Sequence, residues 1–427
     1  MTPDAPPLDP ILCRRALEAL RAGVPNRDVA RLLVPLHGRA TAEFDTLLRD
    51  TENSWDTKRA ARGFVVSGGF GAGKSHLLEY LQHRALESNF ICSRVVLSKE
   101  TPLGDLTKLF RACVQAASAP GRTGAVLNEI AETLDIDRAP SYPDFYSWVH
   151  ENQKLDPRLA ATVFLFDRQA RSDPELREKL LGEWNGFPML TRELKAAVKA
   201  AGDDGSKAYV IGRAARGAEY HRFEFLTRFF RAAGYNGWVI LLDEMELVAR
   251  YSLRQRGKSY AHLAMLLGAV ESARVPGLAV VGAVTDDYAG EVLRRRHDIE
   301  KVPERMRLAN DPNTSEAELG MSLIETGSIP LAIPSKKQIE DTFEQLRAIY
   351  AAAYRWEPPA SLANTPEYAG STRMRQYVRA WINLWDLRRL YNYGATTVIE
   401  KVVVSYDEDA DLAAGSGDAD TAAQGEE

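Results

Sequence analysis

Residues 63–81 read GFVVSGGFGAGKSHLLEYL, and their pattern is the strongest indication of the fold class. Its first five residues are a short apolar run, typical of a buried parallel strand. A glycine-rich loop follows, and after it a helix with leucines along one face. A second strand-like run at residues 94–98 completes a strand–helix–strand unit. Such a unit predicts a parallel sheet with a right-handed crossover.

The loop matches the pattern GxxxxGK[ST] over Gly68, Gly69, Phe70, Gly71, Ala72, Gly73, Lys74 and Ser75. Glycines let backbone N–H groups converge on phosphate oxygens at the positive N-terminus of the following helix. Lys74 is expected to reach the β- and γ-phosphates, and the Ser75 hydroxyl to bind Mg²⁺. The alternative is a glycine turn that matches the pattern by chance. Residues 68–75 lie between a strand and a helix, as the motif requires, and a chance match need not. We therefore interpret residues 68–75 as a phosphate-binding loop of the Walker A type.

Two adjacent carboxylates, Asp243 and Glu244, end another apolar strand-like run at residues 238–242. Asp243 is expected to hold the Mg²⁺ shell, as in a Walker B motif, and Glu244 to orient and deprotonate the attacking water. A strand ending in a solvated acidic turn is the alternative. The phosphate-binding loop favours the functional interpretation, and Glu244 indicates hydrolysis rather than nucleotide storage. Glu246 either supports the metal shell or is exposed to solvent.

A polar strand end follows the apolar run 278–284, at Thr285 and Asp286. If this strand lies between the two motif strands, either side chain can contact the γ-phosphate or the attacking water. A simple polar turn is the alternative.

Arginines can sense the γ-phosphate from a lid or from a neighbouring subunit. Arg373, just inside a C-terminal helix, suits a lid, and Arg305 and Arg307 suit contact with a neighbour. A surface salt bridge is the alternative for each of them. The run at residues 294–296 could instead contact nucleic-acid phosphates.

The chain is expected to be an α/β protein with a parallel sheet core flanked by helices. Because 168 residues separate Ser75 from Asp243, a helical insertion is expected between core strands. The expected segments are an N-terminal helical segment (1–55), the first part of the core (56–118), the insertion (119–215), the second part of the core (216–310), a C-terminal helical lid (311–400) and a disordered acidic tail (401–427). The helices flanking residues 23–26 could bind DNA as a helix–turn–helix, although most such hairpins only pack on a neighbouring core.

Composition supports a globular protein, since 45% of the 427 residues are hydrophobic and 26% are charged. No apolar run reaches transmembrane length, and the first residues lack the pattern of a signal peptide. The three cysteines are far apart, which disfavours a zinc site or a disulfide framework. We therefore expect a cytoplasmic protein with no membrane partner. The net charge of −5 comes from the acidic tail, so the near-neutral body permits a nucleic-acid patch without arguing for one.

Five stretches together resemble one family: LEALRAGVPNRDVARLL, GFVVSGGFGAGKSHLLEYL, SRVVLSKETPLGDL, GYNGWVILLDEMELV and STRMRQYVRAW. Over about residues 10–400 the chain is similar to the ATP-binding proteins of BREX bacterial phage-defence systems, of the BrxD type. The resemblance implies a P-loop ATPase related to the AAA+ class and similar to origin-recognition ATPases. It implies Lys74, Ser75, Asp243 and Glu244 as the nucleotide site, with ATP and Mg²⁺ as ligands. It also implies other BREX-type defence proteins as partners.

Two functions remain open at this point. In the first, ATP hydrolysis drives the remodelling or loading of DNA or partner proteins. In the second, the protein is a nucleotide-dependent switch or scaffold with little or no turnover. A kinase is a third option, although no acceptor site is recognisable. DNA binding and a homo-oligomeric state are also left open.

Overall fold

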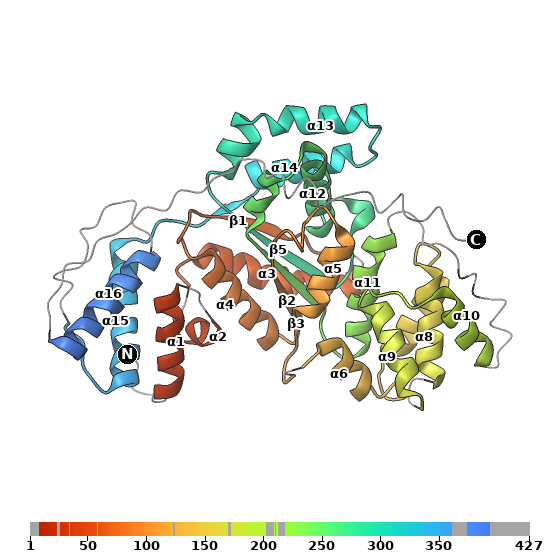
Figure 1. Cartoon of the computed structure of the whole chain (residues 1–427), viewed down its shortest axis with the longest axis horizontal. Helices are drawn as coiled ribbons and strands as arrows, with labels where there is room; N and C mark the ends of the chain where they lie inside the picture. The colour runs from red at the N-terminus through yellow and green to blue at the C-terminus, as the bar shows by residue number, and fades with distance from the viewer. Residues whose placement is uncertain are drawn as a thin grey trace.

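A six-stranded sheet forms the centre of the described part of the chain (Figure 1). The computed structural model describes residues 8–23, 26–33, 35–57, 59–122, 124–169, 172–201, 209, 211, 218–360 and 374–392. The strands are β1 (Phe64–Ser67), β2 (Ile91–Val96), β3 (Ala117–Ser118), β4 (Trp238–Asp243), β5 (Leu278–Val284) and β6 (Ile329–Pro330). Their order is β3-β2-β4-β5-β1-β6, and every neighbouring pair is parallel except β2 and β3. The expected α/β class with a mainly parallel sheet is confirmed.

Strand β5 lies between β1 and β4 and pairs with both in parallel. The carboxyl ends of these three strands therefore meet at one edge of the sheet, where ligands of open α/β sheets bind. A glycine is required at position 282 inside β5, because a Cβ there would clash with the sulfur of Met245. The segments after β1, β4 and β5 are thus brought together by the strand order.

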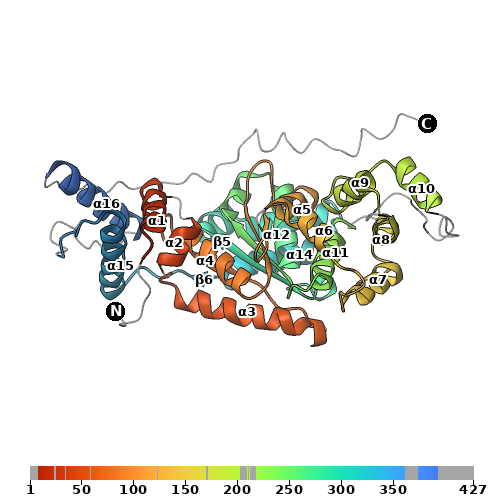
Figure 2. The same ribbon diagram turned by 90° about the horizontal axis from the view of Figure 1, so that it is seen from below.

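Helices cover both faces of the sheet. One face packs against α3 (Gly38–Thr57) and α4 (Lys74–Glu87), and alternate strand residues such as Val66 and Leu241 point to it. The other face packs against α5 (Leu106–Gln115), α11 (Ala218–Ala232) and α12 (Leu253–Leu266), with Val65 and Ile240 pointing to that side. Figure 2 shows α3 running along one side of the sheet. The strands read as continuous apolar runs because both of their faces are buried.

The stretch between β3 and β4 is helical in its described residues. It contains α6 (Val126–Thr133), α7 (Tyr142–Glu151), α8 (Pro157–Gln169), α9 (Pro174–Trp184) and α10 (Thr191–Ala200). Aromatic side chains join these helices to α11, and the Trp184 ring meets Phe225 and Phe229 at 5.4 and 5.0 Å. Next to these aromatic side chains, the fully buried Glu183 forms ion pairs with Arg158 at 2.7 Å and with Arg222 at 3.3 Å. The stretch therefore packs on the sheet domain through α11.

The two ends of the described chain form a separate bundle. It consists of α1 (Pro10–Ala22), α2 (Arg27–Leu32), α15 (Lys336–Tyr354) and α16 (Met374–Tyr391), and we call it the terminal bundle (Figure 1). Its hydrophobic cluster includes Leu17, Phe343 and Trp381. Arg21 donates two hydrogen bonds, of 2.8 and 2.9 Å, to Asp386. Residues 1–55 thus contribute to two packing units, because α3 lies on the sheet whereas α1 and α2 lie in the bundle.

Two further helices, α13 (Asp298–Leu308) and α14 (Thr314–Glu325), pack beside α12 (Figure 1). A buried ion pair of 2.9 Å between Arg256 and Asp298 joins α12 to α13. Within the described residues, no helix combines the length and the apolar character needed to cross a membrane. The expectation of a disordered acidic tail concerns residues 401–427, which lie outside the described residues.

Candidate nucleotide-binding site

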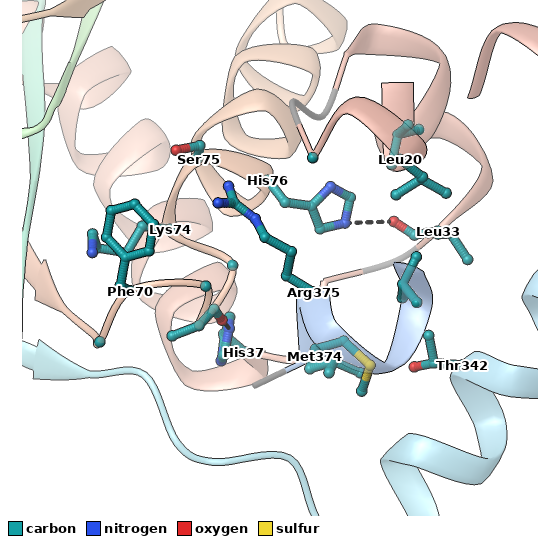
Figure 3. A pocket seen from close by; sticks show the side chains of 18 of the residues that line it. Leu20, Leu33, His37, Phe70, Lys74, Ser75, His76, Thr342, Met374 and Arg375 are labelled. Carbon is teal, nitrogen blue, oxygen red and sulfur yellow. Dashed lines mark hydrogen bonds between the residues drawn. The ribbon is translucent and has the colours of Figure 1, made fainter. Parts of the chain in front are cut away.

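A cleft lies between the terminal bundle and the edge of the sheet where β1, β4 and β5 end (Figure 3). It encloses about 1140 Å³, part of which is open to solvent. Among the described residues, the lining comes from the loop after β1 with the start of α4, the turn after β4, residues of α1, α2 and the region just before α3, and the facing helices α15 and α16. Segments from both ends of the chain therefore meet across the loop.

The loop at residues 68–75, which we call the glycine loop, needs its glycines for their backbone conformation. Gly71 and Gly73 have φ angles of 80° and 97°, in the left-handed region that favours glycine. A Cβ at Gly68 would lie only 3.0 Å from the Cβ of Leu331. Gly73 precedes α4 directly, so the loop ends at the N-terminus of a helix. This combination is a cradle that fits the phosphates of a nucleotide.

Lys74 lies across the glycine loop. Its Nζ donates a 2.7 Å hydrogen bond to the carbonyl oxygen of Gly68, and the residue is 9% exposed. Ser75 follows it and also lines the cleft. The structure therefore brings the predicted cation and the predicted hydroxyl to the same place.

The acidic turn after β4 faces the loop. Asp243 is buried at the end of β4, and its Oδ1 accepts a 3.1 Å hydrogen bond from the Glu244 backbone N–H. Glu244 is exposed and lines the cleft with a φ of 58°, which is unusual for a residue other than glycine. Strained backbone of this kind clusters at functional sites. The hydroxyl of Ser75 and the carboxylate oxygens are hard oxygen ligands of the kind that Mg²⁺ takes.

Arg94 holds the second oxygen of Asp243, a role the sequence did not reveal. Its guanidinium donates a 3.1 Å hydrogen bond to Oδ2 of Asp243 and a 2.6 Å hydrogen bond to Glu79. Glu79 lies on α4, one turn beyond Ser75. Arg94 on β2 and Asp243 on β4 are far apart in sequence, and only the strand pairing brings them together. The resulting ion network fixes the carboxylate of Asp243 relative to α4.

Glu246 also lines the cleft, and a role for it in the metal shell stays a prediction. Its side chain is partly buried, and burial raises the pKa of its carboxyl group, while the Lys74 ammonium acts in the opposite direction. Among the described residues, no hydrogen-bond partner contacts its buried Oε2. Glu246 therefore adds a carboxyl group close enough to Lys74 for the two charges to interact.

Thr285 occupies the position that the sequence argument required, directly after a strand lying between β1 and β4. It is 3% exposed, whereas Asp286 is exposed. Neither residue lines the cleft as the structure describes it. Their role in contacting phosphate or water stays a prediction.

Arg375 is the arginine that the described structure brings into the cleft, while Arg373 lies outside the described residues. Figure 3 shows its side chain reaching from the start of α16 towards the glycine loop and α4. Its guanidinium carbon lies 5.7 Å from the centre of the Phe70 ring. Burial and the neighbouring Arg379 lower the pKa of Arg375, and Asp243 acts in the opposite direction. A cation is thus held opposite the acidic turn.

The other predicted arginines lie on or near α13. Arg305 is exposed, and Arg307 is 63% exposed and paired with Glu318. Neither lines the cleft of its own chain. The basic run at residues 294–296 makes contacts with Glu325, Glu291 and the carbonyl oxygen of Ala249.

The side of the cleft formed by the terminal bundle is largely apolar. Aliphatic and thioether side chains line it, namely Leu20, Val29, Leu33, Leu36, Met374 and Val378. Thr342 and Gln345 of α15 add polar groups. One side of the cleft therefore suits phosphates, and the other suits a flat apolar ring.

Comparison with family models gives one match, described as the BREX system ATP-binding protein BrxC/D. The match covers residues 12–134 and 190–375, which include the glycine loop, the acidic turn and Arg375. Comparisons with curated proteins and with solved structures gave no match.

Proposed function

Because the chain belongs to the family of BREX system ATP-binding proteins BrxC/D, we propose that it binds and hydrolyses ATP in the cleft described above. The observation that carries the proposal is the meeting of the glycine loop and the acidic turn in one cleft. The strand order supports assignment to P-loop NTPases related to the AAA+ class, because it puts a strand between the two motif strands.

In this proposal the glycine loop holds the phosphates through its backbone N–H groups. Lys74 contacts the β- and γ-phosphates, as expected for the lysine of such a loop. Ser75 and Asp243 hold Mg²⁺, which when bound neutralises charge on the phosphates. The apolar side of the cleft holds the base. This division follows from the lining of the cleft, where charged and polar groups gather around the loop and the aliphatic side chains around the bundle.

Glu244 is the proposed general base. Its carboxylate orients the attacking water and accepts its proton, and its exposed position in the cleft leaves it accessible to water. Thr285, at the end of β5, is the candidate for contacting the γ-phosphate or the water. Arg305 and Arg307 stay candidates for a contact supplied by a neighbouring subunit of a homo-oligomer.

Arg375 is proposed to act as the lid arginine on the phosphates. We expect Arg375→Ala to weaken ATP binding about tenfold or more, since a charge-assisted hydrogen bond is typically worth about 1.5–3 kcal/mol. Arg379→Ala is the matched control, because Arg379 lies one turn along α16 but is exposed and does not line the cleft. Titration with a fluorescent ATP analogue measures both variants. Equal affinities for the two variants would remove Arg375 from the site.

The wider role proposed is that of a component of a BREX defence system. Its nucleotide cycle would remodel or load DNA or partner proteins of that system. The alternative is a nucleotide-dependent switch or scaffold with little turnover. The exposed Glu244 favours the first function, because a storage site has no need of a base beside its phosphates.

Steady-state ATP hydrolysis tests the proposal. It is measured in Mg²⁺ buffer for the protein alone, with DNA, and with purified partner proteins of its system. The proposal expects phosphate release that depends on Mg²⁺ and rises with DNA or a partner. ATP binding without release under all of these conditions would favour the switch.

A further inference from the structure

The described residues between α2 and α3, namely residue 33 and residues 35–37, lie between the terminal bundle and the glycine loop. Leu33 and Leu36 line the apolar side of the cleft, and Pro35 is buried. We call this segment the α2–α3 connection. The position of the α2–α3 connection therefore sets the positions of Leu33 and Leu36 in the cleft.

Two histidines bind the α2–α3 connection to the glycine loop in a reciprocal way. The Nε2 atom of His76, the residue after Ser75, lies 3.1 Å from the carbonyl oxygen of Leu33 (Figure 3). The Nε2 atom of His37 lies 3.0 Å from the carbonyl oxygen of Ala72. A carbonyl oxygen only accepts hydrogen bonds, so each Nε2 carries the hydrogen. Each segment therefore donates one imidazole hydrogen bond to the backbone of the other.

Burial favours the neutral form of both rings. Burial lowers the pKa of His37, and burial lowers the pKa of His76 to about 4. With Nε2 protonated, the second nitrogen of each neutral ring carries no hydrogen. The two hydrogen bonds thus set the tautomer of each ring as well as its orientation.

Other contacts fix the α2–α3 connection from both of its sides. The backbone N–H of Thr41, in the first turn of α3, donates a 3.1 Å hydrogen bond to the carbonyl oxygen of His37. Gln338 of α15 donates a 2.9 Å hydrogen bond to the carbonyl oxygen of Leu36. The connection is therefore attached to the sheet domain and to the terminal bundle at once.

We propose that His37 and His76 are positioning residues for the nucleobase. They hold the α2–α3 connection on the glycine loop and so place Leu33 and Leu36 against the base. This inference rests on the proposed function, since it assigns roles within the same ATP site. A ligand without a base makes no use of these leucines. The histidines should therefore matter for ATP and not for a bare triphosphate.

The test compares two amide substitutions of His76. In His76→Gln the amide nitrogen reaches the position of Nε2 and can still donate to Leu33, whereas in His76→Asn it falls short. We expect His76→Asn to weaken ATP binding about five- to tenfold, the typical net effect of one lost hydrogen bond, and His76→Gln to stay within about twofold of wild type. Affinity for inorganic tripolyphosphate should stay within about twofold for both variants. Calorimetric titration of the full chain gives all of these affinities.

The same pair of substitutions at His37 provides a second measurement. We expect His37→Gln to retain ATP affinity and His37→Asn to lose it, because only the longer amide reaches Ala72. Equal ATP affinities for the Gln and Asn variants at both positions would overturn the inference. Equal losses for ATP and tripolyphosphate in the Asn variants would overturn it too. A wild-type protein that binds no ATP would instead contradict the proposed function, so the two failures are distinguishable.

Discussion

Lys74→Ala is expected to abolish ATP binding while leaving the fold intact. The Lys74 ammonium lies across the glycine loop and belongs to none of the hydrophobic clusters, so its removal costs the core little. The contacts it makes with phosphates are charge-assisted, and their loss should weaken ATP binding by about a hundredfold or more. Thermal melts with and without ATP measure the effect, since a bound ligand raises the melting temperature. The variant should melt like the wild type and show no shift with ATP.

Lys108→Ala is the control for this prediction. Lys108 is 45% exposed on α5 and makes a long ion pair with Asp105 at 4.0 Å, away from the cleft. The control variant should keep the ATP-dependent rise in melting temperature. An equal rise in the Lys74→Ala variant would show that Lys74 does not serve the phosphates.

Glu244→Gln should bind ATP and hydrolyse it very slowly. Glutamine keeps the shape of the side chain and can still hydrogen-bond to water, but it cannot accept the proton. We expect a loss of about a hundredfold or more in turnover, the range of a general base, with ATP affinity changed by no more than about threefold. Single-turnover hydrolysis at saturating protein separates the chemical step from binding.

Glu271→Gln is a matched control, because the Glu271 side chain is 90% exposed and lies outside the cleft. Its single-turnover rate should equal that of the wild type. If Glu244→Gln turns over within about threefold of the wild type, another residue activates the water and Glu244 loses its assigned role.

Local patterns in the sequence were sufficient to predict the sheet and the motifs that the cleft brings together. The glycine loop and the acidic turn each follow an apolar strand, and parallel strands bring their carboxyl ends to one edge of a sheet. From these two facts the meeting of Lys74 with Asp243 and Glu244 could be expected before the structure was known. The sequence did not predict that β5 lies between β1 and β4. That position was only the condition under which Thr285 could contact the γ-phosphate or the attacking water.

Contacts between distant segments could not be predicted in this way. Nothing local to α1 indicates that its apolar face packs on α15 and α16, which are close to the other end of the described chain. The pairing of Arg94 with Asp243 depends on the register between β2 and β4. His37 and His76 have no motif of their own, and their reciprocal hydrogen bonds exist only when the α2–α3 connection lies on the glycine loop. A single sequence contains no signal for such pairings.

The position of Arg375 in the cleft depends on the phase of α16. The sequence indicated an arginine near the start of a C-terminal helix, which α16 provides. Which residues of α16 face the cleft depends on where the helix begins and how it is rotated on the bundle. Helix ends inferred from sequence alone carry an uncertainty of about two to four residues, so the place of Arg375 in the cleft could not be predicted.

Photo-crosslinking with 8-azido-ATP, followed by peptide mapping, locates the bound nucleotide, because the reactive group of this analogue is on the base. The proposal is that ATP lies between the glycine loop and the terminal bundle. We expect labelling within residues 20–36 or 374–378, suppressed by excess ATP and absent from the Lys74→Ala variant. Labelling confined to α6–α10 or α13–α14, or labelling that persists in excess ATP, would contradict it.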